Sequence, residues 1–271
     1  MDGIQVRVKI GFVAGYRFMY SDWCDKMNRE SIEALRRIEG VDLVTLPDSG
    51  DRNLSDPETG AVPFGCIHSL DEAEAAASFF RKQQVQAIVI GALDFGDERS
   101  AVMVARLLDV PVCLYATKEP EPIQDPSMRR QSDSYCGTLA LASGLVRRKI
   151  PFHFAGILFP GDTAFNRELG MFVRAAGVVA GLKNARIGHI GNRPAGFESV
   201  AYNEDALLRR FNQTVVVETA SNIIKSGFSL EKTDPQLRRI MEEMQEECDL
   251  SSVNQRYLET AARLETALTR F

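Results

Sequence analysis

An apolar run, Ala87–Ile90, passes directly into a polar, glycine-marked cluster, Gly91–Arg99, and together they read AIVIGALDFGDER. The run is short and rich in β-branched residues, as expected of a parallel strand that is buried on both faces. Asp97 and Glu98 in the cluster suit the cap and first turn of a helix. A strand that leads through a loop into a helix is the repeating unit of parallel α/β proteins.

The same pattern occurs four more times along the chain. The other clusters that follow an apolar run of strand length are Gly15–Trp23, Thr117–Pro120, Phe159–Asp162 and Gly188–Pro194. In a parallel sheet, all such strand-to-helix loops emerge at the carboxyl edge, where ligands bind. The charged and aromatic residues of these loops are therefore expected to converge on one edge.

Residues 1–182 are predicted to form an N-terminal α/β domain with a doubly wound parallel sheet of the flavodoxin or Rossmann type. The expected strands are Val6–Val13, Val41–Leu46, Ala87–Ile90, Pro111–Tyr115 and Phe154–Phe159. Periodicity and capping signals place the helices at Cys24–Ile38, Leu70–Gln83, a segment that ends at Leu108, Ser134–Arg148 and a segment capped by Asp162. The end of the long connection Pro47–Ser69, at Phe64–His68, is expected to form either a short strand or a contact with the sheet edge.

Residues 183–271 are predicted to begin a second, incomplete α/β domain. The expected elements are strands Ala185–Ile190 and Thr214–Val217, helices Glu204–Phe211 and Ala220–Ser226, a helix that starts at Thr233–Pro235, and a helix Val253–Phe271 opened by the capping box Ser252-x-x-Gln255. Two strands are few for such a domain, and the apolar stripe of the last helix runs on without a stop signal. The chain is therefore expected to be cut from a longer polypeptide, with the alternative that the last helix packs on a partner.

Composition limits the possible partners and the location. The net charge is -5 and no basic block occurs, so neither nucleic acid nor an anionic membrane is an expected partner. The apolar stretches have strand length, and residues 1–9 lack the core of a signal peptide. A cytoplasmic location is the expectation.

The five cysteines support the same location, because they are odd in number, scattered and without a C-x-x-C pair. Cys24 and Cys136 lie at expected helix starts, where the pKa of a thiol can fall. A small buried side chain is nevertheless the favoured interpretation of both.

One loop after the first strand concentrates side chains that suit a small polar ligand. It contains Arg17, Tyr20, Asp22 and Trp23. Aromatic faces beside hydrogen-bonding groups are typical of sugar sites, but Trp, Tyr and Arg are also the preferred anchors of subunit interfaces. Both interpretations stay open. The matching loop of the second domain, Asn192–Glu198, is either a ligand loop or a surface turn.

The acidic cluster after the third strand also has two interpretations. Asp94, Asp97 and Glu98 could provide carboxylates for acid–base work or for a metal ion. A role in starting the next helix is favoured for Asp97 and Glu98, and Asp94 stays undecided. The histidines His68, His153 and His189 lack metal-ligand spacing. The chain has no G-x-G-x-x-G or G-K-[ST] motif, so a nucleotide cofactor has little support.

Four stretches resemble the L-fucose/L-arabinose isomerase family, and most of all the L-fucose isomerase-like proteins. They are Gly15–Glu30 (GYRFMYSDWCDKMNRE), Gly91–Ser100 (GALDFGDERS), Cys113–Lys118 and Ile187–Ala201 (IGHIGNRPAGFESVA). No single motif is decisive. The resemblance lies in their joint order along the α/β units, and it covers the whole chain.

The resemblance implies two N-terminal α/β domains, a C-terminal β-rich domain and an enzyme that interconverts aldoses and ketoses with a divalent cation, usually manganese. It implies a homo-oligomer in which the N-terminal domain of one subunit closes the active site of a neighbour. The metal ligands and acid–base groups of the family lie after the matched region. This chain is therefore expected to be an N-terminal fragment with no catalytic residue and no bound metal of its own.

For this chain the resemblance implies a small-molecule sugar as the ligand. The expected substrate contacts are Arg17, Tyr20, Trp23, Asp94, Asn192 and Arg193. The first three would form the wall that is given to a neighbour's site, and the last two would lie nearer to the chain's own site.

Two other functions stay open. The first is a cytosolic sugar-binding module without catalysis, which would need two comparable lobes. The second is an enzyme complete in this chain, which would need Asp94, Glu98 and a histidine to converge on a metal ion.

Overall fold

The computed structural model describes residues 7–17, 20–120, 122, 124, 125, 127, 130–247 and 249–271. Val6, where the first strand was expected to begin, lies outside these residues, as do Phe18, Met19 and Cys248 of the sequence patterns above. The chain divides into two compact units, Met1–Ala180 and Gly181–Phe271. Within the described residues, no helix combines the length and the apolar composition needed to cross a lipid bilayer.

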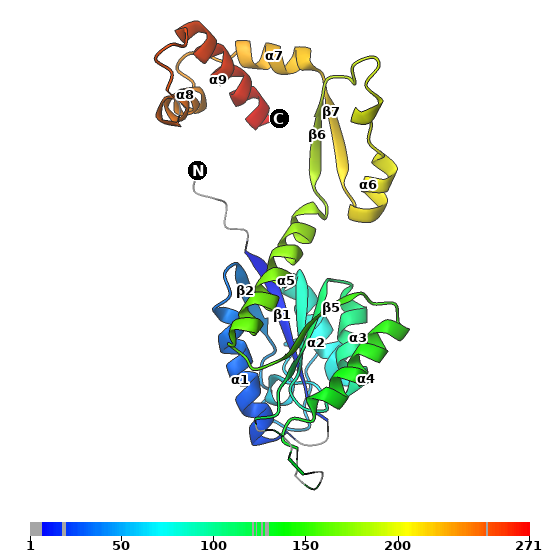
Figure 1. Ribbon diagram of the computed structural model, residues 1–271. Coiled ribbons are helices and arrows are strands. Elements are labelled where there is room, and N and C mark those ends of the chain that lie inside the picture. Colours follow the sequence, from blue (N-terminus) through cyan, green and yellow to red (C-terminus); the bar gives the residue numbers. More distant parts are fainter. Residues whose placement is uncertain are drawn as a thin grey trace. The chain divides into compact units, whose positions relative to one another are not determined.

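The first unit contains a parallel five-stranded sheet with the order β2-β1-β3-β4-β5 (Figure 1). The strands are β1 Val8–Gly15, β2 Val41–Thr45, β3 Ala87–Ala92, β4 Val112–Thr117 and β5 Phe152–Leu158. This is the order of flavodoxin-type sheets, so the predicted doubly wound fold is confirmed. The order reverses between β1 and β3, which run side by side from Ile10 opposite Ala87 to Gly15 opposite Ala92.

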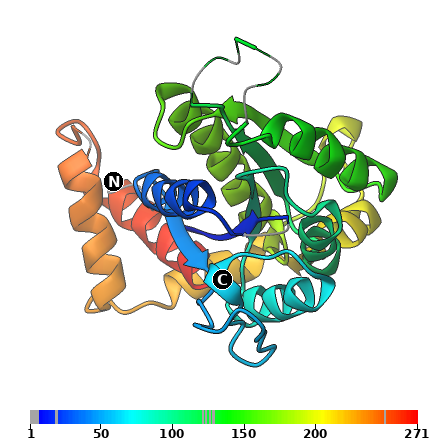
Figure 2. The same cartoon turned by 90° about the horizontal axis from the view of Figure 1, so that it is seen from below.

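Helices cover both faces of this sheet (Figure 1 and Figure 2). They are α1 Asp22–Arg36, α2 Leu70–Lys82, α3 Glu98–Leu108, α4 Ser134–Arg147 and α5 Thr163–Leu182. One core lies between the sheet and α1 with α5, and a second core lies between the sheet and α2, α3 and α4. Ala87 and Val89 of β3 enter the first core, and Ile88 and Ile90 enter the second. This placement explains why β3 is apolar at every position.

Side-chain caps start α2 and α3 where the sequence predicts. Ser69 and Glu72 form the capping box of α2. The Asp97 carboxylate accepts hydrogen bonds from backbone N–H groups at the start of α3. The predicted element ends differ from the observed ones by one or two residues in most cases, which is usual for helix and strand ends.

The second unit contains two parallel strands, β6 Arg186–Ile190 and β7 Thr214–Glu218. Its helices are α6 Glu204–Phe211, α7 Ala220–Phe228, α8 Pro235–Glu247 and α9 Gln255–Arg270. The strands and helices that were predicted for the second unit are thus present. The expected capping box Ser252-x-x-Gln255 is wrong, because the Asn254 side chain caps α9 instead and accepts the N–H of Arg256. Because α9 begins at Gln255, Asn254 directly precedes the helix and Ser252 lies too far from it to act as the cap.

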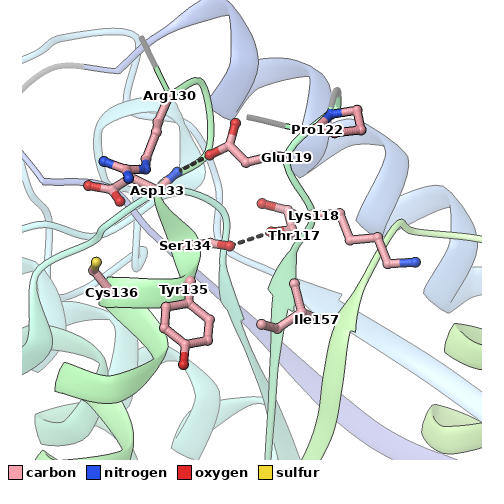
Figure 3. Close-up of a pocket in the computed structure, with 10 residues that line it drawn as sticks. All are labelled: Thr117, Lys118, Glu119, Pro122, Arg130, Asp133, Ser134, Tyr135, Cys136 and Ile157. Carbon is pink, nitrogen blue, oxygen red and sulfur yellow. Dashed lines mark hydrogen bonds between the residues drawn. The ribbon is translucent and has the colours of Figure 1, made fainter. Parts of the chain in front are cut away.

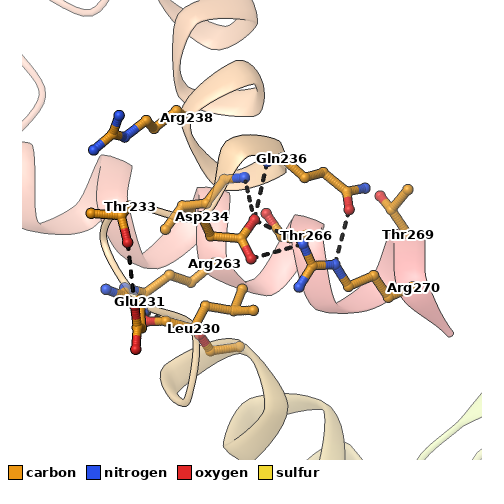
Figure 4. Close-up of polar contacts among 12 residues, drawn as sticks. Leu230, Glu231, Thr233, Asp234, Gln236, Arg238, Arg263, Thr266, Thr269 and Arg270 are labelled. Carbon is orange, nitrogen blue, oxygen red and sulfur yellow. Dashed lines mark hydrogen bonds and ion pairs between the residues drawn. The ribbon is translucent and has the colours of Figure 1, made fainter.

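Two arginines of α9 fasten the helices of the second unit to one another (Figure 4). Arg263 is buried and donates to the carbonyl oxygens of Gly227, at 3.3 Å, and Leu230, at 2.5 Å. Arg270 lies 2.7 Å from the Asp234 carboxylate, which begins α8. These contacts join α7, α8 and α9 around the small core of Leu237, Ile240 and Ala262.

Candidate functional site

The carboxyl ends of β1 and β3 meet where the strand order of the first unit reverses. Ligands of doubly wound sheets bind outside the strands at such a point. Arg17, Tyr20 and Trp23 follow β1, and Asp94 follows β3. The fold therefore brings the four expected contact residues of the first unit to one edge of the sheet, which we call the β1/β3 rim.

Trp23 links the two loops of this rim. It lies in the first turn of α1, which starts because the Ser21 hydroxyl accepts the backbone N–H of Cys24. The indole Nε1–H donates to the carbonyl oxygen of Leu93, at 2.9 Å. With its one polar atom engaged, the ring is held in a fixed orientation beside the loop after β3.

Arg17 lies against an aromatic ring of the neighbouring loop. Its guanidinium carbon is 3.9 Å from the centre of the Phe95 ring, which is the geometry of a cation–π contact. A planar guanidinium offers several N–H donors in a fixed fork. The contact holds this donor fork at the β1/β3 rim.

Tyr20 belongs to an aromatic cluster with Tyr16 and Phe64. Its ring is parallel to the Phe64 ring, with 4.1 Å between the centres, and it meets the Tyr16 ring edge-on at 5.5 Å. Phe64 comes from the long connection before α2, in the short 3-10 helix Pro63–Gly65. Burial raises the pKa of Tyr20 far above its ordinary value, so the hydroxyl stays a neutral donor, and it reaches Asp25 at 3.4 Å.

Asp94 is held by contacts from both loops. Its Oδ1 accepts the N–H of Gly96, at 2.6 Å, and its Oδ2 accepts the S–H of Cys24, at 3.3 Å. Burial raises the pKa of the Asp94 carboxyl group. Burial also raises the pKa of the Cys24 thiol to about 12, so this thiol is a buried, unreactive side chain, as the favoured interpretation held.

Asn192 and Arg193 lie in an exposed loop of the second unit, directly after β6. A neighbouring contact in this unit joins Nδ1 of His189 to the hydroxyl of Tyr202, at 2.8 Å. The short 3-10 helix Glu198–Val200 lies between these two partners in the sequence. The proximity of Asn192 and Arg193 to a sugar stays a prediction.

A cavity of about 520 Å³ opens beside the end of β4 (Figure 3). Its lining residues are Thr117, Lys118, Glu119, Pro122, Arg130, Asp133, Ser134, Tyr135, Cys136 and Ile157. The Glu119 carboxylate accepts the backbone N–H groups of Gln131, Ser132 and Asp133, at 3.0, 3.1 and 2.7 Å, and so closes the loop after β4 onto the start of α4. Sequence patterns missed this cavity, because they give no signal for a carboxylate that folds back onto residues far along the same loop.

Cys136 corrects one expectation of the sequence. It is exposed in the first turn of α4 rather than buried, because this turn borders the cavity and not the core. The adjacent Asp133 carboxylate raises the pKa of the Cys136 thiol. A helix start therefore does not activate this thiol.

The described part of the chain does not fit a divalent cation. Among these residues, no three His, Cys, Asp or Glu side chains lie close enough together to hold a metal ion. A metal site made from Asp94, Glu98 and a histidine is thus not formed there. Asp97, the third acid of this cluster, accepts the N–H of Ser100, at 2.8 Å, and serves as a helix cap.

Comparison with known protein families places this chain. Residues 11–183 match the N-terminal domain of the fucose/sulfoquinovose isomerases. The chain therefore belongs to the fucose/sulfoquinovose isomerase family, and the resemblance seen in the sequence is confirmed. No curated protein matches the chain. The matched range contains the carboxyl end of β1 and all the other elements that build the β1/β3 rim and the cavity beside β4.

Proposed function

We propose that this chain provides the N-terminal, sugar-contacting part of a metal-dependent aldose–ketose isomerase. The observation that carries the proposal is the meeting of Arg17, Trp23 and Asp94 at the reversal of strand order, in a member of a sugar isomerase family. Ligands bind at such a point in doubly wound sheets. The aromatic and donor groups that gather there have the chemistry that a sugar requires.

Each group has a separate task in this proposal. The Trp23 ring, fixed by its bond to Leu93, offers an apolar surface to the C–H face of a sugar. The Arg17 guanidinium, held over Phe95, offers N–H donors to sugar hydroxyl oxygens. Asp94 fixes the relation between the two loops through Cys24 and Gly96.

The proposal assigns the divalent cation and the proton transfer to other residues of a longer protein, because the described residues do not fit a metal. It also includes a homo-oligomer in which the β1/β3 rim closes a neighbour's site. Tyr135, Leu139 and Val146 support an assembly surface, because they lie along α4 and are 64%, 59% and 64% exposed. Apolar residues that are grouped on a surface mark interaction sites.

The test is an isomerisation assay with manganese on L-fucose, L-arabinose and D-arabinose. It compares this 271-residue chain with the full-length product of its gene. Activity in the longer protein alone supports the proposal. Activity in the 271-residue chain would contradict the assignment of the metal to other residues, and sugar binding without turnover in both proteins would favour the binding module.

A matched pair of variants tests the β1/β3 rim within the active protein. Arg17→Ala should lower kcat/KM by about 10-fold to 100-fold, since hydrogen bonds from a charged donor contribute about 1.5–3 kcal/mol. Arg36→Ala removes an exposed arginine from the far end of α1 and should leave kcat/KM unchanged. Equal effects of the two substitutions would contradict a role of the rim in sugar binding.

A further inference from the structure

His68 lies at the level of the β1/β3 rim, although no sequence pattern assigned it a role. The preceding residue, Ile67, pairs with the end of β1: its N–H donates to the carbonyl oxygen of Ala14, at 2.8 Å, and its own carbonyl oxygen accepts the N–H of Tyr16, at 3.1 Å. His68 therefore lies beside Tyr16, just beyond the carboxyl end of β1. Because Tyr16 directly precedes Arg17, His68 belongs to the same edge of the sheet as the expected sugar contacts.

A buried carboxylate holds the imidazole ring of His68. Oε2 of Glu72 lies 2.9 Å from Nδ1 of His68 and also accepts the backbone N–H groups of His68, at 2.6 Å, and Ser69, at 3.2 Å. A carboxylate can only accept hydrogen bonds, so Nδ1 carries the proton and donates it. In the neutral imidazole, Nε2 then has a lone pair, the arrangement by which carboxylates orient histidines in functional sites.

The ring is also fixed from the side and is open at the rim. It stacks on the Tyr16 ring, with 4.6 Å between the centres, and Tyr16 meets Tyr20 edge-on. The His68 side chain is 34% exposed, whereas the Glu72 side chain is 6% exposed. Nε2 has no hydrogen-bond partner among the described residues. The capping box itself needs only Ser69 and Glu72, so it does not explain the imidazole.

We propose that His68 contacts the sugar directly, with Nε2 accepting a hydrogen bond from a sugar hydroxyl group, and that Glu72 is the residue that positions it. This inference rests on the proposed function, because it names one more contact of the same site. It requires no change of protonation. The proton on Nδ1 stays directed at Glu72, and the sugar hydroxyl supplies the proton of the new bond.

Two substitutions at position 68 separate this contact from a structural role. His68→Asn retains an amide N–H near the place of Nδ1, which can still reach Glu72, but it removes Nε2. His68→Gln retains a hydrogen-bonding group near the place of Nε2. The control is His153→Asn, because His153 also lies near a glutamate (3.5 Å from Glu168) but is near the amino end of β5, away from the rim.

Kinetics of the full-length protein provide the first readout. His68→Asn should raise KM about threefold to tenfold with kcat little changed, as expected for one neutral hydrogen bond. His68→Gln should recover part of that loss, and His153→Asn should match the wild type. Thermal unfolding of all variants shows whether a loss of fold explains any change. Equal KM values for His68→Asn and His153→Asn would overturn the inference while leaving the proposed function intact.

Imidazole NMR signals provide a readout that needs no activity. In the wild type, the ring ¹⁵N spectrum of His68 should show a protonated Nδ1, and Glu72→Gln should mix the two tautomers. Titration with L-fucose, L-arabinose or D-arabinose should shift the Nε2 signal. If the wild-type protein shows no isomerase activity but its His68 signals shift with a sugar, the contact is supported and only the proposed isomerase activity is overturned. An inactive wild type whose His68 signals do not move with any of these sugars would overturn both proposals.

Discussion

The indole N–H of Trp23 donates a hydrogen bond of 2.9 Å to the carbonyl oxygen of Leu93. Trp23 belongs to the helix after β1, and Leu93 belongs to the loop after β3, so one bond joins the two loops that border the reversal of strand order. Trp23 is also the single tryptophan of the chain. Its fluorescence therefore reports on this edge of the sheet and on no other place.

Sugar binding should change the emission of Trp23. A sugar that packs on the indole face removes water from it, and the fixed ring cannot turn away. The measurement is a fluorescence titration of the full-length protein with L-fucose, and subtraction of the emission of its Trp23→Phe variant isolates the signal of Trp23. That variant should also lose about 1 kcal/mol of unfolding free energy through the missing bond to Leu93. Unchanged emission at a sugar concentration that saturates the calorimetric binding signal would contradict this placement.

Asp94 should make the first unit less stable as pH rises. Burial raises the pKa of this carboxyl group above its ordinary value of 3.8, so the folded state binds the proton more tightly than the unfolded state. The stabilising contribution is complete below 3.8 and is lost as pH rises through the raised pKa. The amide of the Asp94→Asn variant does not titrate. As pH rises from 3.8 through the raised pKa of Asp94, the unfolding free energy of the wild type should therefore fall relative to that of the variant.

Urea unfolding at a series of pH values measures that difference. Asp56→Asn is the control in the same unit, because a hydrogen bond from the Thr59 hydroxyl lowers the pKa of Asp56. A lowered pKa has the opposite sign, and its contribution is lost as pH falls. Parallel curves for the wild type and Asp94→Asn would show that burial of Asp94 has no energetic consequence.

Gly137→Ala should disturb the loop after β3. A Cβ atom at Gly137 of α4 would overlap the carbonyl oxygen of Phe95, because the helix passes directly against that loop. A backbone atom cannot turn aside as a side chain can, so we expect a loss of about 1–3 kcal/mol in unfolding free energy. Gly181→Ala in α5 meets no atom and should stabilise the helix by up to about 1 kcal/mol. Chemical unfolding of both variants tests the contrast, and a neutral Gly137→Ala would refute this packing.

Arg263→Met should loosen the second unit. The substitution keeps the aliphatic length but removes the guanidinium donor of the Leu230 carbonyl oxygen and one of the donors of the Gly227 carbonyl oxygen. We expect a loss of about 1–3 kcal/mol, because the partly buried Leu230 acceptor then lacks its donor. Arg238→Ala removes an exposed arginine of α8 and should change the unfolding free energy by less than about 0.5 kcal/mol. Amide hydrogen exchange of α7 and α9 measures this loss of stability within the second unit. Equal protection of these helices in Arg263→Met and Arg238→Ala would contradict the role of Arg263.

The α/β fold could be predicted because its signals are local. β3 is apolar throughout since both of its faces are covered, and the Ser69–Glu72 capping box and the Asp97 cap are short-range patterns. The family could be recognised from the loops after the strands. The last helix start was misplaced because Ser252 and Asn254 are both good caps, and only backbone geometry selects Asn254.

The members of the β1/β3 rim were named from the sequence, but their contacts were not. No sequence pattern shows that Trp23 reaches Leu93, that Arg17 lies on Phe95, or that Cys24 bonds to Asp94. These partners are far apart in the chain. The reversal of strand order between β1 and β3 brings them together, and the order of parallel strands is set by packing of the whole sheet.

The sequence by itself determined the alternation of strands and helices, the family and the edge of the sheet where polar loops emerge, because these depend on periodicity and local caps. Only the tertiary structure decided which loops become neighbours. It closed Glu119 onto the start of α4 and stacked the His68 ring on the Tyr16 ring. Such contacts form between distant segments, and their geometry exists only after the chain has packed.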